Sequence, residues 1–143
     1  MTHYQSNNFQ IAVEYKHDKT FVNHRVVHDV VNTKDLPKTM QILRATIPTI
    51  FDNQCFNYAK QSFAKEVAKT ETGHLLEHLI LEFLKLEIEK EYGYADFSGI
   101  TRWDWSKNPR GTFEIEINSK RHQAANFSRA LSKALCVLEE IYS

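Results

Sequence analysis

Three residues that lie close together in the sequence have the types and spacing of a metal-dependent hydrolytic site. His74 and His78 are four residues apart, and Glu77 stands between them. On a helix, residues four apart lie one turn above each other, so both imidazoles can reach one ion at about 2 Å from each nitrogen. Glu77 lies next to that face, where its carboxylate can hold a water molecule and take its proton. We therefore predict a zinc site with His74 and His78 as metal ligands and Glu77 as the catalytic base.

The predicted site lacks a third protein ligand, which a catalytic zinc ion commonly has in addition to a position for water. A predicted strand at 112–118 carries an outward row of polar side chains and can lie beside the helix. We predict Glu116 as the third metal ligand, and Glu114 and Asn118 in the same row are the alternatives.

The surroundings of the two histidines favour a site over a chance arrangement. The stretch 75–81 is apolar nearly all the way round a helix, which is typical of a buried helix. Polar side chains within it are costly to bury unless they have partners. Glu82 lies one turn beyond His78. It is predicted to hold the metal ligands in position without binding the ion itself, or else to pair with Lys85 or Lys90.

Ordinary structural roles are the alternative for these side chains. Two histidines on one helix can also be core or surface groups whose hydrogen bonds are satisfied without a metal ion. A motif of five residues with two free positions also arises by chance in many proteins. Polar or alternating surroundings predict solvated side chains for the other five histidines, which are His3, His17, His24, His28 and His122. The two cysteines, Cys55 and Cys136, are interpreted as structural thiols in a reduced cytoplasmic setting, with one disulfide as the alternative.

Alternation of apolar and polar residues predicts the strands that support the motif helix. It is regular over 9–16, and a valine-rich segment at 20–31 predicts a second strand, with the front half of a helix as the alternative. Two further strands are predicted at 95–105 and 112–118, joined by a strong turn cluster at 106–111. We expect each pair to form a hairpin.

Helical spacing of apolar residues predicts three or four helices. The predicted helices are a short one that opens at Leu36-Pro37 and stops before Pro48, one with the stripe Phe56, Ala59, Phe63 and Val67, the motif helix at about 73–91, and a closing helix from Ala124. The fold class that follows is α+β. We expect one domain over 1–143, with about four antiparallel strands in two hairpins and the helices packed on the sheet.

Composition and charge exclude several classes of partner. The chain has 143 residues, with eighteen basic and eighteen acidic side chains. Because these charges cancel, there is no overall field to attract a phosphate backbone or an anionic membrane surface. No apolar run approaches the roughly 20 residues that cross a bilayer. We expect a soluble, cytoplasmic protein without a nucleic-acid or membrane partner, and the sequence leaves the oligomeric state open.

The segment 63–82 resembles the amino-terminal domain of cyanophycin synthetases, where a Gly-His-x-x-Glu-His-x-x-x-Glu helix recurs. The residues that carry this pattern here are Gly73, His74, Glu77, His78 and Glu82. Other pieces fall in the same order, namely 47–50, Thr101-Arg102, 111–113 and the alanine-rich helix from Ala124. The similarity therefore covers most of the chain.

The resemblance implies a function for the motif helix. In that family the domain precedes two ligase parts that build a poly-aspartate chain with arginine on each side chain, and we expect no such synthesis from these 143 residues alone. In some members the domain looks like a cryptic zinc peptidase that cleaves the polymer internally, and its motif is similar to that of pitrilysin-type peptidases. This implies His74 and His78 as ligands and Glu77 as the base.

The same resemblance leaves the third ligand open. The family strand carries a carboxylate where an ungapped match places Asn118, so the third ligand is either Glu116 through a shift or missing. The resulting hypothesis is a zinc-dependent hydrolase that cleaves amide bonds of a peptide or cyanophycin-like polymer. The alternative is a non-catalytic module that binds a polymer or a partner protein.

Overall fold

The computed structural model describes residues 2–55 and 62–143 of the chain. The strands of this part are β1 (Thr2–Gln5), β2 (Phe9–Tyr15), β3 (Thr20–Val26), β4 (Gly99–Arg102) and β5 (Thr112–Ile117). The helices are α1 (Thr39–Thr46), α2 (Phe63–Glu66), α3 (Thr72–Tyr92) and α4 (Ala124–Tyr142), with 3₁₀ turns η1 (Thr33–Asp35), η2 (Pro48–Asp52) and η3 (Arg121–Gln123).

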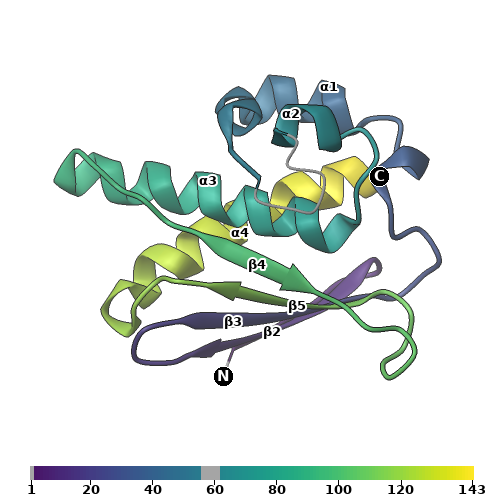
Figure 1. The fold of residues 1–143 in the computed structure, drawn as a ribbon, viewed down its shortest axis with the longest axis horizontal. Helices are drawn as coiled ribbons and strands as arrows, with labels where there is room; N and C mark the ends of the chain where they lie inside the picture. The colour runs from purple at the N-terminus through teal and green to yellow at the C-terminus, as the bar shows by residue number, and fades with distance from the viewer. Residues whose placement is uncertain (1, 56–61) are drawn as a thin grey trace.

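The described strands form one antiparallel sheet in the order β1-β2-β3-β5-β4, and the helices lie together over one of its faces (Figure 1). The predicted α+β fold is confirmed, with the hairpins β2–β3 and β4–β5 joined through the pairing of β3 with β5. The described part has one strand more than the four expected. It is β1, which pairs with β2 at the sheet edge.

Several predicted boundaries differ from the observed ones. The second predicted strand ends at Val26 instead of residue 31, and the third contracts from 95–105 to the four residues of β4. Of the predicted stripe that includes Phe56 and Ala59, these two residues lie outside the described part. Its other members, Phe63 in α2 and Val67 just after it, are fully buried in the core.

The helix α3 is the central element of the helical layer. It packs along α4 and also contacts β4 and β5. Twelve of its 21 residues are buried, as its apolar sequence predicted. The helix ends at Gly93, whose φ of 74° gives the left-handed conformation that glycine adopts without strain at a helix end. Among the described residues, no helix is both long enough and apolar enough to cross a membrane.

Gly73 sets how closely the start of α3 approaches the sheet. A Cβ atom at this position would lie 2.2 Å from Cγ of Phe113 on β5, well inside van der Waals contact. Only a residue without a side chain leaves room for that ring. The glycine of the motif therefore has a packing role, because it brings the first turn of α3 down onto β5.

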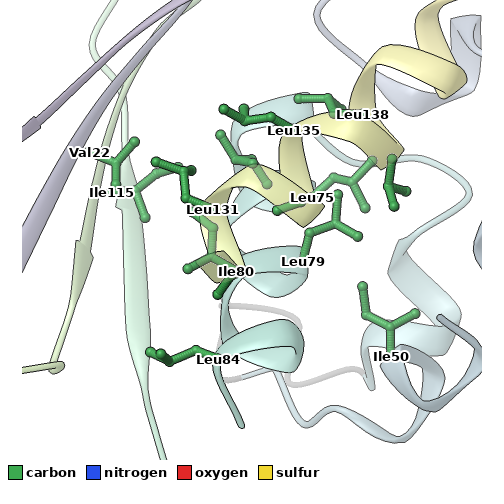
Figure 2. Close-up of a cluster of buried hydrophobic side chains, with 14 of the residues drawn as sticks. Val22, Ile50, Leu75, Leu79, Ile80, Leu84, Ile115, Leu131, Leu135 and Leu138 are labelled. Atoms are coloured by element: carbon green, nitrogen blue, oxygen red, sulfur yellow. The ribbon is translucent and has the colours of Figure 1, made fainter. Parts of the chain in front are cut away.

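The core fills the space between the sheet and the two long helices and extends past α3 to Ile50 of η2 (Figure 2). The inner row of β5 consists of Phe113, Ile115 and Ile117, all buried as predicted, while Glu114 and Glu116 point to the other face. Leucines of α3 and α4 meet this row, and Figure 2 shows Leu75, Leu79, Ile80, Leu131, Leu135 and Leu138 gathered between the helices and Val22 and Ile115. Burying each such side chain contributes roughly 1.5–3 kcal/mol.

The prediction of a solvated His24 is wrong. Its side chain is fully buried on the helix-facing side of β3, between the rings of Phe9 and Phe113, each with its centroid 5.6 Å away. Neither ring nitrogen has a hydrogen-bond partner in the described part of the chain. The physical reason is the strand period of two, which puts residue 24 on the same face as the buried Val22 and Val26. Of the other four histidines, three are exposed and His28 is half-buried.

Candidate metal centre

The helix α3 brings its two motif histidines together, as their four-residue spacing predicted. The ring centroids of His74 and His78 lie 4.8 Å apart. His78 is almost completely buried and His74 is half-buried. Phe63 of α2 closes one side, because its ring stacks on His78 with centroids 4.1 Å apart and meets His74 edge-on. The two imidazoles therefore share a confined space between α2 and α3.

Cys55 completes a group of three potential metal ligands. Its Sγ lies 3.2 Å from Nε2 of His74, and one ligand atom from each of Cys55, His74 and His78 lies within 4.8 Å of the others. Ligand atoms around a tetrahedral zinc ion are roughly 3.5 Å apart, which follows from zinc–nitrogen and zinc–sulfur bonds of about 2.0 and 2.3 Å. The 3.2 Å separation and the 4.8 Å upper bound lie on either side of this value. We call these three residues the Cys–His–His cluster.

The second nitrogen of each imidazole is held by a neighbouring side chain. Nδ1 of His74 is 2.8 Å from Oγ1 of Thr70, and Nδ1 of His78 is 3.0 Å from Oδ1 of Asn53. An amide oxygen only accepts hydrogen bonds, so Nδ1 of His78 donates and its Nε2 keeps a lone pair for a metal ion. Ring nitrogens of metal-binding histidines are usually fixed in this way.

Glu82 supports this arrangement from outside the ligands, which is the first of its two predicted roles. Its Oε2 accepts a hydrogen bond of 2.6 Å from Nδ2 of Asn53, the same amide that accepts from His78. The carboxylate thereby fixes the orientation of the amide, and the amide fixes the tautomer of the histidine. A continuous hydrogen-bonded chain runs from Glu82 through Asn53 to His78.

Glu77 lies on the side of the cluster that faces β4. Its Oε1 accepts a hydrogen bond of 2.7 Å from Oγ1 of Thr101, and its Oε2 lies 3.8 Å from Nε2 of His78. Burial raises the pKa of Glu77 to about 7, and the hydrogen bond from Thr101 opposes this shift. Near neutral pH this carboxyl group is therefore poised between its protonated and ionised forms.

The two histidines are neutral at the same pH. Burial lowers the pKa of His78 to about 3, with a further lowering from His74, and burial also lowers the pKa of His74. The contact between Glu77 and His78 is thus not an ion pair at neutral pH, since the imidazole is uncharged. Neutral imidazole is the form that binds a metal ion.

No protein-family model, no curated protein and no solved structure matches this chain. The resemblance to the cyanophycin synthetase domain accordingly remains a prediction, and the site is described from its own geometry.

The structure does not bring the predicted third ligand to the histidines. Glu116 points to the sheet face opposite α3, where its carboxylate lies 3.7 Å from Nζ of Lys19. Glu114 lies on the same outer face, and the side chain of Asn118 accepts a hydrogen bond from the backbone N–H of Ser98. The prediction placed the polar row of β5 beside the helix. The helix instead covers the apolar row, because burial of that row stabilises the fold.

Several residues of the candidate site were not predicted from the sequence. Cys55 was interpreted as structural, although a cysteine in a reduced setting with histidines elsewhere in the chain is a recognised signal of metal binding or catalysis. It lies nineteen positions before His74, so no local spacing connects the two. The supporting roles of Asn53, Thr70 and Thr101 likewise depend on tertiary contacts and have no signature in the sequence.

Proposed function

We propose that this protein is a zinc-dependent hydrolase that cleaves amide bonds in a peptide or poly-amino-acid substrate. Cys55, His74 and His78 hold the metal ion, and Glu77 is the catalytic base. The observation that carries the proposal is the position of a buried carboxylate beside three convergent ligand atoms. The likeness of the motif helix to that of cyanophycin synthetases and pitrilysin-type peptidases supports the same function.

The donor set suits a catalytic zinc ion. A thiolate and two imidazoles make three protein ligands and leave the fourth position for water or substrate. A zinc ion in such a site supplies a Lewis acid that polarises a carbonyl group and lowers the pKa of water.

The residues of the chain then divide the proton transfers of amide hydrolysis. Glu77, ionised, takes a proton from the attacking water as the new C–O bond forms, and it delivers that proton to the departing nitrogen as the C–N bond breaks. Thr101 holds Oε1 of the carboxylate, so Oε2, the oxygen nearer to His78, is the one that exchanges the proton.

A second candidate is a binding module in which the metal ion has a structural role. It is favoured by the limited exposure of Glu77, which is 5% of its surface, together with its hydrogen bond to Thr101. In this case the cluster would stabilise the contact between the loop that carries Cys55 and α3, and the protein would bind its polymer or protein partner without cleaving it.

Substitution of Glu77 by glutamine separates the two candidates. Glutamine keeps the shape of the side chain but cannot accept the proton, so Glu77→Gln should retain zinc and lose about 10²–10⁴-fold in turnover of a fluorescence-quenched peptide library. The matched control is Glu91→Gln, which changes an exposed glutamate near the far end of the same helix and should leave turnover unchanged. Equal activity of Glu77→Gln and wild type would contradict the assigned base. A zinc-loaded wild type that cleaves no library member would favour the binding module.

A further inference from the structure

The site borders a sheet edge that has backbone groups without a strand partner. In the described residues β4 is the last strand of the sheet and pairs only with β5 (Figure 1). An edge strand of this kind presents N–H and C=O groups to which another extended chain can bind. The short length of β4, four residues, and the exposed charge of Arg102 limit uncontrolled pairing at this edge.

The register shows which residues of the strand carry the outward backbone groups. The backbone N–H of Asn118 donates to the carbonyl of Ser98 at 3.1 Å, so these opposite residues form a hydrogen-bonded pair. Hydrogen-bonded and non-hydrogen-bonded pairs alternate along an antiparallel ladder. Ile100 is therefore bonded to β5, whereas the backbone N–H and C=O of Gly99 and Thr101 point away from it, toward the free edge.

The same two residues lie directly against the proposed catalytic base. The hydroxyl of Thr101 donates to Glu77 at 2.7 Å. A Cβ atom built on Gly99 would lie 3.2 Å from Cγ of Glu77, which shows that the glutamate side chain passes over this glycine. The outward backbone groups and the carboxylate thus belong to one small region of the molecule.

We propose that the substrate of this site is an extended peptide segment that pairs with the free edge of β4 through the backbone of Gly99 and Thr101. This inference rests on the proposed hydrolase function. A strand bound there lies about 4.8 Å from β4 and runs past Glu77, so its peptide bonds come close to the base and to the Cys–His–His cluster. Main-chain pairing selects an unfolded or unstructured chain with free amide N–H groups.

Two variants at one position test the pairing. Thr101→Pro removes the outward N–H but none of the bonds to β5, and proline is tolerated on an edge strand in that orientation. Thr101→Val is the matched control, because both variants lose the hydroxyl that contacts Glu77 and only the proline variant loses the N–H. Thermal unfolding of the two variants checks that each is folded.

The probe is a pooled library of acetylated and amidated hexapeptides, together with the same library N-methylated at alternate residues. We expect the bound pool to slow amide hydrogen exchange at Gly99 and Thr101 at least tenfold, while Ile100, already bonded to β5, stays unchanged. We also expect at least tenfold weaker binding to Thr101→Pro than to Thr101→Val, and at least tenfold weaker binding of the N-methylated pool.

Three results would overturn the proposal: no protection of Gly99 and Thr101 by any pool, equal binding of the N-methylated pool, or protection that rises with protein concentration alone and so reveals pairing with a second copy of the chain. Failure of the hydrolase function is distinguishable. If Gly99 and Thr101 are protected but the protein binds no zinc and cleaves no peptide, the hydrolase function is wrong and the peptide pairing stands. If the protein shows Glu77-dependent turnover but these two residues are not protected, only the pairing is wrong.

Discussion

Replacement of His24 by leucine should make the protein less sensitive to acid. The imidazole is fully buried between two phenylalanine rings, and neither nitrogen has a hydrogen-bond partner in the described part of the chain. Burial lowers the pKa of His24 to about 3 in the folded state, against an ordinary value of about 6.5. The unfolded chain therefore takes up a proton at this residue as the pH falls, at values where the folded protein does not.

The size of the effect follows from this difference in pKa. The contribution of the neutral His24 to the free energy of unfolding is fully present above pH 6.5. It is lost as the pH falls from 6.5 to about 3, by roughly 1.4 kcal/mol per pH unit. At pH 4.5 the protonation of the unfolded state costs about 3 kcal/mol, which for a chain of this length lowers the midpoint of thermal unfolding by roughly 10 °C. His24→Leu removes this loss and fills the same apolar space, so it should be as stable as wild type at pH 7 and clearly more stable at pH 4.5.

The assay is chemical denaturation at a series of pH values from 7.5 to about 4.5, with the free energy of unfolding compared between wild type and His24→Leu. The difference between the two proteins isolates His24, because His78 and the other titrating groups are present in both. His122→Leu, at an exposed histidine, is the control and should follow wild type. A free-energy difference between wild type and His24→Leu that stays constant over this range would refute the reasoning.

Three further substitutions give independent checks. Gly73→Ala should destabilise the fold by about 1–3 kcal/mol in denaturant titrations, because the new Cβ meets the buried ring of Phe113 at 2.2 Å. Asn53→Leu should weaken zinc binding by about 10–100-fold in competition with a chelating dye, since it removes the hydrogen bond that fixes one histidine ligand. Glu87→Gln should reduce the free energy of unfolding by about 1 kcal/mol, and so lower the thermal midpoint modestly, because it weakens the 2.6 Å contact with Lys133. High salt should make this difference from wild type smaller.

The features that the sequence predicted are those encoded by local periodicity. The helical position of His74, Glu77 and His78 follows from a four-residue spacing inside an apolar stretch, and the structure brings the two histidines together as that spacing requires. The alternation on β5 likewise predicted which of its side chains are buried. Such patterns depend on residues within one element, so they survive without knowledge of the tertiary structure.

The third ligand could not be predicted in the same way, because it depends on how separate elements meet. Glu116 was chosen on the assumption that the polar face of β5 lies beside the helix, but the apolar face is the one that α3 covers. Cys55 and His74 meet only through a tertiary contact, which no spacing rule describes. The burial of His24 follows from the alternation along β3, although polar residues stand on either side of it in the sequence.

Cobalt titration of the protein tests the central claim most directly, because Co²⁺ replaces zinc and reports its ligands by absorption. In a Cys136→Ser background, which removes the exposed thiol, we predict one equivalent of tetrahedral Co²⁺ with a thiolate-to-cobalt charge-transfer band. Cys55→Ser should abolish that band, His74→Ala should weaken binding strongly, and Glu116→Gln should change neither. Absence of saturable binding, or a site lost in Glu116→Gln and kept in Cys55→Ser, would contradict the proposed Cys–His–His metal centre.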